Sequence, residues 1–211
     1  ILELSKKYNV KKVLYASSSS VYGDKKKYPV SENENINPKN IYSLSKKNNE
    51  EMAEVYNKQY GIKLIGLRFF TVYGEWGRPD MLMIKYMLAK LNKKIFILNN
   101  KGNHFRDFTY IKDVTEILIK LLKIKNIKGH QIFNICSNKP IKVSKILSDL
   151  NKLYGKPKIK FYKKLSIEVL KTHGSNLKLK KYIKIKKFTN INIGLSNLII
   201  WANEHLNKIK Y

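Results

Sequence analysis

Cysteine is nearly absent from this chain of 211 residues, in which Cys136 stands alone. A single cysteine excludes an intramolecular disulfide. No apolar run approaches the ~18 residues that a membrane-spanning helix needs, and no charged-then-apolar targeting segment opens the chain. The four histidines and the cysteine show no metal-ligand spacing. We therefore expect a cytoplasmic protein with no membrane anchor and no metal site.

Acidic residues are also few, 15 against 43 basic ones, and the formal net charge is +28. Such a charge suggests a nucleic-acid partner. Arginine, however, occurs only at positions 68, 78 and 106, and lysine supplies the remaining basic residues along the whole chain. Nucleic-acid sites usually favour arginine for its planar fork of donors. We therefore expect no nucleic-acid partner, although the charge should speed encounters with anionic ligands.

Hydrophobic residues make up 43% of the chain, which suffices for a sizeable core at this length. Apolar runs of strand length alternate with helical periodicity, and crossovers of helix length favour a parallel sheet covered by helices. The pattern predicts strands at 13–16, 63–70, 95–98, 131–135 and 159–162. It predicts helices at 42–60, about 81–91, 111–122, 143–154 and 192–206, with a further helical pattern at the start of the chain.

Tyr42 and Lys46 stand four residues apart on a predicted helix, so their side chains meet on one face. A lysine ammonium beside a phenol favours the phenolate, which is a general base for an alcohol proton. The spacing alone is not specific, because the lysine-rich chain contains six Tyr-x-x-x-Lys pairs. The serine run 17–20 distinguishes Tyr42, because it ends a predicted buried strand just before the Tyr42 helix. Ligands of doubly wound sheets bind at such strand ends.

Five motifs, in order and spacing, resemble the extended short-chain dehydrogenase/reductases that epimerise nucleotide sugars. They are Tyr15–Gly23, Tyr42–Lys46, Leu67–Gly74, Trp76–Met81 and Arg106–Ile111. The likeness is dense from residue 1 to about 135 and weaker beyond. The third and fourth motifs are most similar to UDP-glucuronate 4-epimerases. All three arginines fall within these motifs, which fits sites that need a bidentate donor for a carboxylate or a diphosphate.

The resemblance implies bound NAD and a UDP-sugar substrate. Tyr42 would remove the proton of the sugar C4 hydroxyl while a hydride passes from C4 to the nicotinamide, and the 4-keto sugar would then take the hydride back on its other face. Ser18 would hydrogen-bond the C4 oxygen, and Lys46 would hold the nicotinamide ribose and favour the Tyr42 phenolate. The implied cofactor contacts are Ser17, Tyr42, Lys46, Phe69 and Thr71. The implied substrate contacts are Ser18, Ser19, Ser20, Thr71, Arg78, Lys85 and Arg106, of which Thr71 and Lys85 would lie near a hexuronate carboxylate and Arg106 on the diphosphate.

The chain departs from the family in two places. It contains no glycine-rich dinucleotide fingerprint, a motif that cradles the pyrophosphate at a helix N-terminus and precedes these motifs in the family. At ~30 residues per βα unit, three to four such units are missing. We therefore interpret the chain as the C-terminal two thirds of an epimerase and expect an exposed sheet edge, little NAD binding, poor solubility and no activity for the isolated chain. In the tail, the family usually carries an acidic, glycine-containing turn followed by a threonine and an aspartate. Glu168, Thr172 and Ser175 occupy those places in this chain, with an unusual His173 beside them.

The expected fold is α/β: a partial Rossmann-like doubly wound parallel sheet with a smaller C-terminal α/β substrate-binding domain. Residues 1–73 are assigned to the C-terminal part of the NAD-binding domain. Residues 74–211 are assigned mainly to the substrate domain, with about 105–135 returning to the first. The family resemblance also implies a homodimer for a full-length protein and a place in polysaccharide precursor synthesis.

Several alternative functions stay open. UDP-glucose 4-epimerase, or another nucleotide-sugar epimerase, is the first, and a non-catalytic binding module built on a truncated remnant is the second. The family's 4,6-dehydratases carry an Asp-Glu pair where this chain has Ser19 and Ser20. Because serine hydroxyls are too weakly acidic for that elimination, we predict no dehydratase activity.

Overall fold

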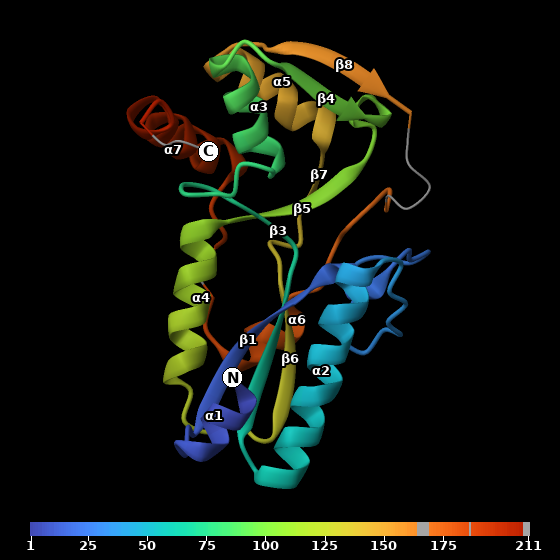
Figure 1. The fold of residues 1–211 in the computed structure, drawn as a ribbon, viewed down its shortest axis with the longest axis vertical. Coiled ribbons are helices and arrows are strands. Elements are labelled where there is room, and N and C mark those ends of the chain that lie inside the picture. Colours follow the sequence, from blue (N-terminus) through green and yellow to red (C-terminus); the bar gives the residue numbers. More distant parts are fainter. Residues whose placement is uncertain (164–168, 186, 209–211) are drawn as a thin grey trace.

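The computed structural model describes residues 1–163, 169–185 and 187–208 (Figure 1). Its helices are α1 (Leu2–Lys7), α2 (Ile41–Tyr60), α3 (Leu82–Leu91), α4 (Ile111–Lys123), α5 (Val143–Tyr154), α6 (Leu177–Tyr182) and α7 (Ile191–His205), with short 3-10 helices η1 (Ser19–Tyr22) and η2 (Asn100–Gly102). Its strands are β1 (Lys12–Ser18), β2 (Lys63–Phe69), β3 (Thr71–Tyr73), β4 (Ile95–Asn99), β5 (Phe105–Tyr110), β6 (His130–Ile135), β7 (Pro140–Lys142) and β8 (Lys158–Tyr162).

A parallel sheet in the order β1-β2-β6 forms the lower half of the molecule in Figure 1. Successive side chains of its central strand point to opposite faces, as a pleated strand requires. Leu64 packs with Ala53 of α2, whereas Ile65 packs with Ile117 of α4 and Leu179 of α6. Helices therefore cover both faces of the sheet, which confirms the predicted doubly wound α/β class.

β1 forms one edge of this sheet. Within the described residues β1 pairs only with β2, so its other edge is open, as the sequence predicts. A cavity of about 610 Å³ lies beside that edge, between α1, β1 and α2. Tyr15, Ala16 and Lys46 are among its lining residues. The cavity therefore reaches the carboxyl-terminal half of β1.

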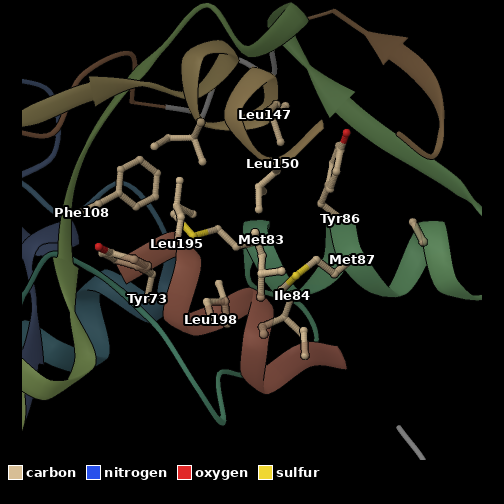
Figure 2. Packing of buried hydrophobic residues seen from close by; sticks show 14 of the residues in the cluster. Tyr73, Met83, Ile84, Tyr86, Met87, Phe108, Leu147, Leu150, Leu195 and Leu198 are labelled. Atoms are coloured by element: carbon tan, nitrogen blue, oxygen red, sulfur yellow. The ribbon is translucent and has the colours of Figure 1, made fainter. Parts of the chain in front are cut away.

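A second hydrophobic core occupies the upper half of the molecule (Figures 1 and 2). In Figure 2, side chains of α3, α5 and α7 point toward one another, and Tyr73 and Phe108 close the cluster from the strand side. Tyr86 and Met87 of α3 are fully buried there. Residues 106–110, for which the sequence predicts no element, form most of β5, and β5 runs between the two halves.

The sequence predicts a parallel sheet and a further, smaller α/β part, but it does not predict how the strands of that second part pair. The structure contains two further sheets among its described residues, β3-β5-β7 and β4-β8, and β5 pairs with β7 in antiparallel fashion. The sequence pattern misses β3, β7 and α6. β3 and β7 have only three residues each and α6 has fewer than two turns, so none of them displays a hydrophobic period that the sequence pattern could reveal.

Residues 170–176, which we call the clasp, connect the two halves. Thr172 donates its backbone N–H to the Phe105 carbonyl of β5 at 3.1 Å. Further along, Val30 donates to the His173 carbonyl at 2.9 Å, and Ser175 donates back to the Val30 carbonyl at 2.8 Å. The clasp thus holds the loop before α2 against β5.

Candidate functional site

The start of α2 places Tyr42. Asn40 caps the helix by accepting the Ser43 backbone N–H at 2.8 Å, and the Ser43 hydroxyl accepts the Asn40 backbone N–H at 3.1 Å. Such reciprocal bonds satisfy N–H groups that a helix start otherwise leaves unpaired. Tyr42 lies in the first turn with 54% of its surface exposed. Its ring is therefore accessible from outside the protein.

Lys46 lies one turn further along α2 and reaches the sheet. Its Nζ donates to the Ala16 carbonyl of β1 at 3.0 Å and lies 5.7 Å from the centroid of the Tyr42 ring. An ammonium has three N–H donors, and the Ala16 contact uses one of them. Because Lys46 also lines the cavity beside β1, its ammonium is placed to hold a ligand there.

The four serines at the end of β1 divide into two kinds. Ser17 is buried, and its hydroxyl donates to the Glu50 carboxylate of α2. Ser18 is 9% exposed and caps η1, and its Oγ accepts the Ser20 backbone N–H at 3.2 Å and the Ser20 hydroxyl at 2.9 Å. Ser19 and Ser20 are half-buried. The hydroxyls of Ser18 and Ser20 thus form a pair, whereas that of Ser17 is turned inward.

The pairing of β1 with β2 places Phe69 beside the serines, since Ser18 lies opposite Phe69 in the register. Thr71 follows at the start of β3, where it is half-buried and lines a small cavity of about 90 Å³. Phe69 therefore lies at the carboxyl end of β2 opposite Ser18, and Thr71 follows two residues later in the chain.

Arg78 and Lys85 lie near each other on the loop before α3 and on α3 itself. Arg78 donates its Nε and Nη2 to the two carboxylate oxygens of Asp80 at 3.0 and 2.7 Å, in an exposed bidentate pair. Hydrogen bonding to Asp80 raises the pKa of Arg78, and Tyr42 adds a smaller electrostatic contribution. Arg78 also holds the pKa of Asp80 below its usual value, with a weaker contribution from Lys85. Asp80 is therefore the direct partner of Arg78 in this loop.

Arg106 belongs to a second basic group, arranged around Tyr28. The His173 ring stacks on the Tyr28 ring with centroids 6.3 Å apart and planes 10° apart, and the Lys171 ammonium lies 4.8 Å from the Tyr28 centroid. Burial raises the pKa of Tyr28, and the charge of Arg106 counteracts that rise. Sequence reasoning missed Tyr28 and Lys171, because neither falls within a recognised motif. Glu168, the other tail residue singled out from the sequence, lies outside the described residues.

Asp107, the residue after Arg106, is completely buried. Its Oδ1 accepts the Ser137 backbone N–H at 3.1 Å and the Ser137 hydroxyl at 2.8 Å, and its Oδ2 accepts the Gly174 backbone N–H at 3.1 Å. Burial raises the pKa of Asp107 above its ordinary value despite these bonds. Asp107 thereby ties β5 to the clasp, a role that the sequence pattern did not indicate.

Arg68, the third arginine, is buried and paired inside the protein. It is 4% exposed and donates its Nε and Nη2 to the two oxygens of Glu50 at 2.9 and 2.7 Å. Burial opposes its charge, but the bonds to Glu50 raise its pKa overall. The bidentate partner that the sequence suggested for this arginine is therefore a carboxylate of α2 rather than a ligand.

The described residues hold no group of three or more histidine, cysteine, aspartate or glutamate side chains arranged for a metal ion. In the same part of the chain, every helix is too short or too polar to cross a bilayer.

Comparison with known proteins identifies the family. The sequence profile of the NAD-dependent epimerase/dehydratase family matches residues 1–136, which hold both the Ser18 region and the Tyr42 helix. The chain belongs to this family. Its α/β fold, with the doubly wound sheet described above, is the fold of the family's solved structures.

Three family members illustrate the similarity. An uncharacterized protein of Methanocaldococcus jannaschii is 41% identical over 207 residues, which cover 97% of this chain and 63% of that protein. UDP-glucuronate 4-epimerase 5 of Arabidopsis thaliana is 35% identical, over 95% of this chain and 50% of the plant protein. The solved UDP-glucuronic acid 4-epimerase of Bacillus cereus, in complex with UDP-glucuronic acid and NAD, superposes with a TM-score of 0.89 at 29% identity, over 96% of this chain and 65% of that chain. This chain thus spans between half and about two thirds of the length of these family members.

Proposed function

We propose that the protein is an NAD-dependent nucleotide-sugar 4-epimerase that acts on UDP-glucuronate. The observation that carries the proposal is the contact of Lys46 with Ala16, which brings the first two turns of α2 to the serine-bearing end of β1. Of the six Tyr-x-x-x-Lys pairs in the sequence, that of Tyr42 shares its motif order with the family. The UDP-glucuronate 4-epimerases of A. thaliana and B. cereus support the choice of substrate.

The residues at the end of β1 fit the nicotinamide end of NAD. The half-buried Lys46 ammonium lines the cavity beside β1 and retains N–H donors suited to ribose hydroxyls. When bound, NAD supplies a reversible hydride acceptor. Tyr42, as phenolate, takes the proton of the sugar C4 hydroxyl and returns it, while Lys46 stabilises the negative charge on the phenol oxygen. Ser18 donates a hydrogen bond to the C4 oxygen, and Ser20 relays or replaces that proton through the bond between the two hydroxyls.

The uronate carboxylate is proposed to bind near Thr71, Arg78 and Lys85. Arg78 offers the planar fork that a carboxylate prefers, and Tyr42 lies within electrostatic range of it. In the structure this fork is occupied by Asp80. Because both partners are exposed, a substrate carboxylate can replace Asp80 at small cost.

The diphosphate is proposed to bind at the basic group around Tyr28. Arg106 and Lys171 supply positive charge there, and the stacked rings of Tyr28 and His173 supply a flat surface. The four positions of this group come from three separate segments, which the clasp brings together.

A neutral hexose substrate, as in UDP-glucose 4-epimerase, is the second candidate. The observation that favours it is the Arg78–Asp80 pair, because Asp80 neutralises the charge that would otherwise attract a uronate. The two candidates differ in what Arg78 does during turnover, and a comparison of substrates separates them.

The test is to measure kcat/KM for UDP-glucuronate and UDP-glucose side by side, with NAD supplied. The assay uses a chimera that places the glycine-rich segment of a family member ahead of Ile1, because the chain alone has no turn to cradle the pyrophosphate, and it is repeated in the Arg78→Ala variant of that chimera. We expect conversion of UDP-glucuronate to its C4 epimer to be the faster reaction. We expect Arg78→Ala to lower kcat/KM for UDP-glucuronate by about tenfold or more, the value of one charge-assisted bidentate contact, and to leave UDP-glucose little changed. Faster turnover of UDP-glucose in the unsubstituted chimera would favour the second candidate. Release of a 4-keto-6-deoxy sugar would contradict both.

A further inference from the structure

Glu50 is a carboxylate buried between α2 and the sheet. It follows Tyr42 by two helical turns and Lys46 by one, and residues four apart share one face of a helix. Only 5% of its surface is exposed. A buried charge is costly unless donors surround it, so its partners show what it does.

Three donors surround the Glu50 carboxylate. Arg68 of β2 donates through Nε at 2.9 Å and Nη2 at 2.7 Å, and the Ser17 hydroxyl at the end of β1 donates to Oε1. The Arg68 guanidinium is itself fixed, because it lies 4.7 Å from the Tyr22 ring centroid and donates Nη1 to the Glu32 carbonyl at 3.3 Å. The pair is therefore anchored to both strands and to the loop before α2.

The contacts of Glu50 and Lys46 fall on neighbouring residues of one strand. Lys46 binds the Ala16 carbonyl and Glu50 binds the Ser17 hydroxyl, and Ser18 is the next residue. A helix that slides by one residue moves 1.5 Å along its axis, which would break both contacts together. These two contacts therefore set the position of α2 along β1.

We propose that Glu50, oriented by Arg68, is a positioning residue that fixes the distance between Tyr42 on α2 and Ser18 on β1. It does not touch the reactants and acts through Ser17 and the helix. The inference deepens the proposed function and rests on it for its catalytic consequence. The claim that Glu50 fixes the position of Tyr42 concerns only the folded chain and does not depend on the proposed function.

If the Glu50–Arg68 pair only stabilised the fold, a folded variant without the pair would keep Tyr42 in its place. Replacement of a buried ion pair by apolar residues of similar volume is often neutral or stabilising, whereas removal of one partner strands a buried charge. The double variant Glu50→Leu/Arg68→Met therefore keeps the fold if the pair is replaceable, and the single Glu50→Leu variant does not serve as the test. Glu51→Gln is the matched control, since Glu51 is the next residue on α2 and forms an exposed pair with Lys47.

The first measurement follows the environment of Tyr42 without any need for activity. We would incorporate 3-fluorotyrosine at position 42 and record its fluorine resonance in the parent protein, in the double variant, in Glu51→Gln and in Lys46→Met. We expect the double variant to melt within a few degrees of the parent protein, while its resonance moves away from the parent position as it does in Lys46→Met. Glu51→Gln should leave the resonance in place. An unmoved resonance in the folded double variant would overturn the proposal.

The second measurement is turnover of UDP-glucuronate, with NAD supplied, by the chimera carrying the same substitutions. We expect kcat of the double variant to fall about a hundredfold with KM little changed, because a displacement of about 1 Å in a reacting group has effects of this size. Unchanged kcat with the double variant folded would overturn the catalytic role. If the resonance moves but the unsubstituted chimera shows no turnover of either sugar, the positioning of Tyr42 stands and the proposed function fails.

Discussion

Each of the three arginines has a partner within the chain, but only one of these partners is buried. Arg68 is enclosed with Glu50, whereas Arg78 holds Asp80 at the surface and Arg106 donates to the Phe105 carbonyl. The sequence singles out all three positions but does not reveal their partners. The sequence does not reveal the partner of Arg68 because that partner, Glu50, stands on α2, and its position depends on how the helix lies on the sheet.

Asp107 illustrates a site that the sequence could not identify. The motif that contains Asp107 indicates a role only for its neighbour Arg106. The hydrogen bonds of Asp107 go to Ser137 and Gly174, which are distant in the chain. Nothing in a local pattern predicts such contacts. The structure makes Asp107 the link between the arginine strand and the clasp.

The raised pKa of Asp107 predicts a pH dependence of stability. The unfolded carboxyl releases its proton near pH 3.9, and the buried one releases it at higher pH. The unfolded state therefore holds fewer protons between these values, so this group's contribution is greatest in acid and falls as the pH rises through the window. We expect the difference in unfolding free energy between the parent protein and Asp107→Asn to decline over that window and then level off. Urea unfolding at a series of pH values measures it, and a flat difference would contradict the assignment.

At the scale of elements, the longer helices and the apolar strands were predictable, whereas the three-residue strands were not. The predicted helix 143–154 agrees with α5, and the predicted helix 42–60 begins one residue after α2 does. β7 has only three residues and is recognisable only from its pairing with β5. The clasp likewise shows no period, because its backbone bonds go to Val30 and Phe105 instead of to a regular neighbour.

The cap of α2 connects helix stability to the site. We expect Asn40→Ala to lower the free energy of unfolding by about 1 kcal/mol, since it removes the acceptor for the Ser43 N–H. It should also lower turnover, because Tyr42 lies in the turn that then frays. Asn190→Ala is the control, for Asn190 caps α7 in the same way through the Asn192 N–H. Urea titration of the 211-residue chain checks the loss of stability, and a UDP-glucuronate assay of the chimera checks the loss of turnover. Equal turnover in the two variants would show that the first turn of α2 does not govern the site.

At the scale of the whole molecule, the proposed site lies at the edge of the sheet that β1 forms. β1 carries the serines and has one paired side among the described residues. The division into a nucleotide-binding part at 1–73 and a mainly substrate-binding part at 74–211 stays a prediction. The position of β5 and the clasp between the two halves is consistent with a site that draws residues from both.

NAD affinity is the property in which the 211-residue chain should differ from a longer family member. The chain has no glycine-rich turn to cradle the pyrophosphate, so we expect weak NAD binding by calorimetry. A chimera that places the glycine-rich segment of a family member ahead of Ile1 should bind NAD more tightly. Stoichiometric NAD in the purified 211-residue chain would contradict this expectation.

The most direct test of the account is the effect of Tyr42→Phe on turnover of UDP-glucuronate in that chimera, with NAD present. Phenylalanine keeps the ring and removes only the hydroxyl that exchanges the C4 proton. We predict that kcat falls by at least about a hundredfold, the usual contribution of a positioned general base, while binding of UDP-glucuronate is retained. Undiminished turnover in Tyr42→Phe would show that another group moves the proton and that Tyr42, Lys46 and Ser18 do not form the catalytic site.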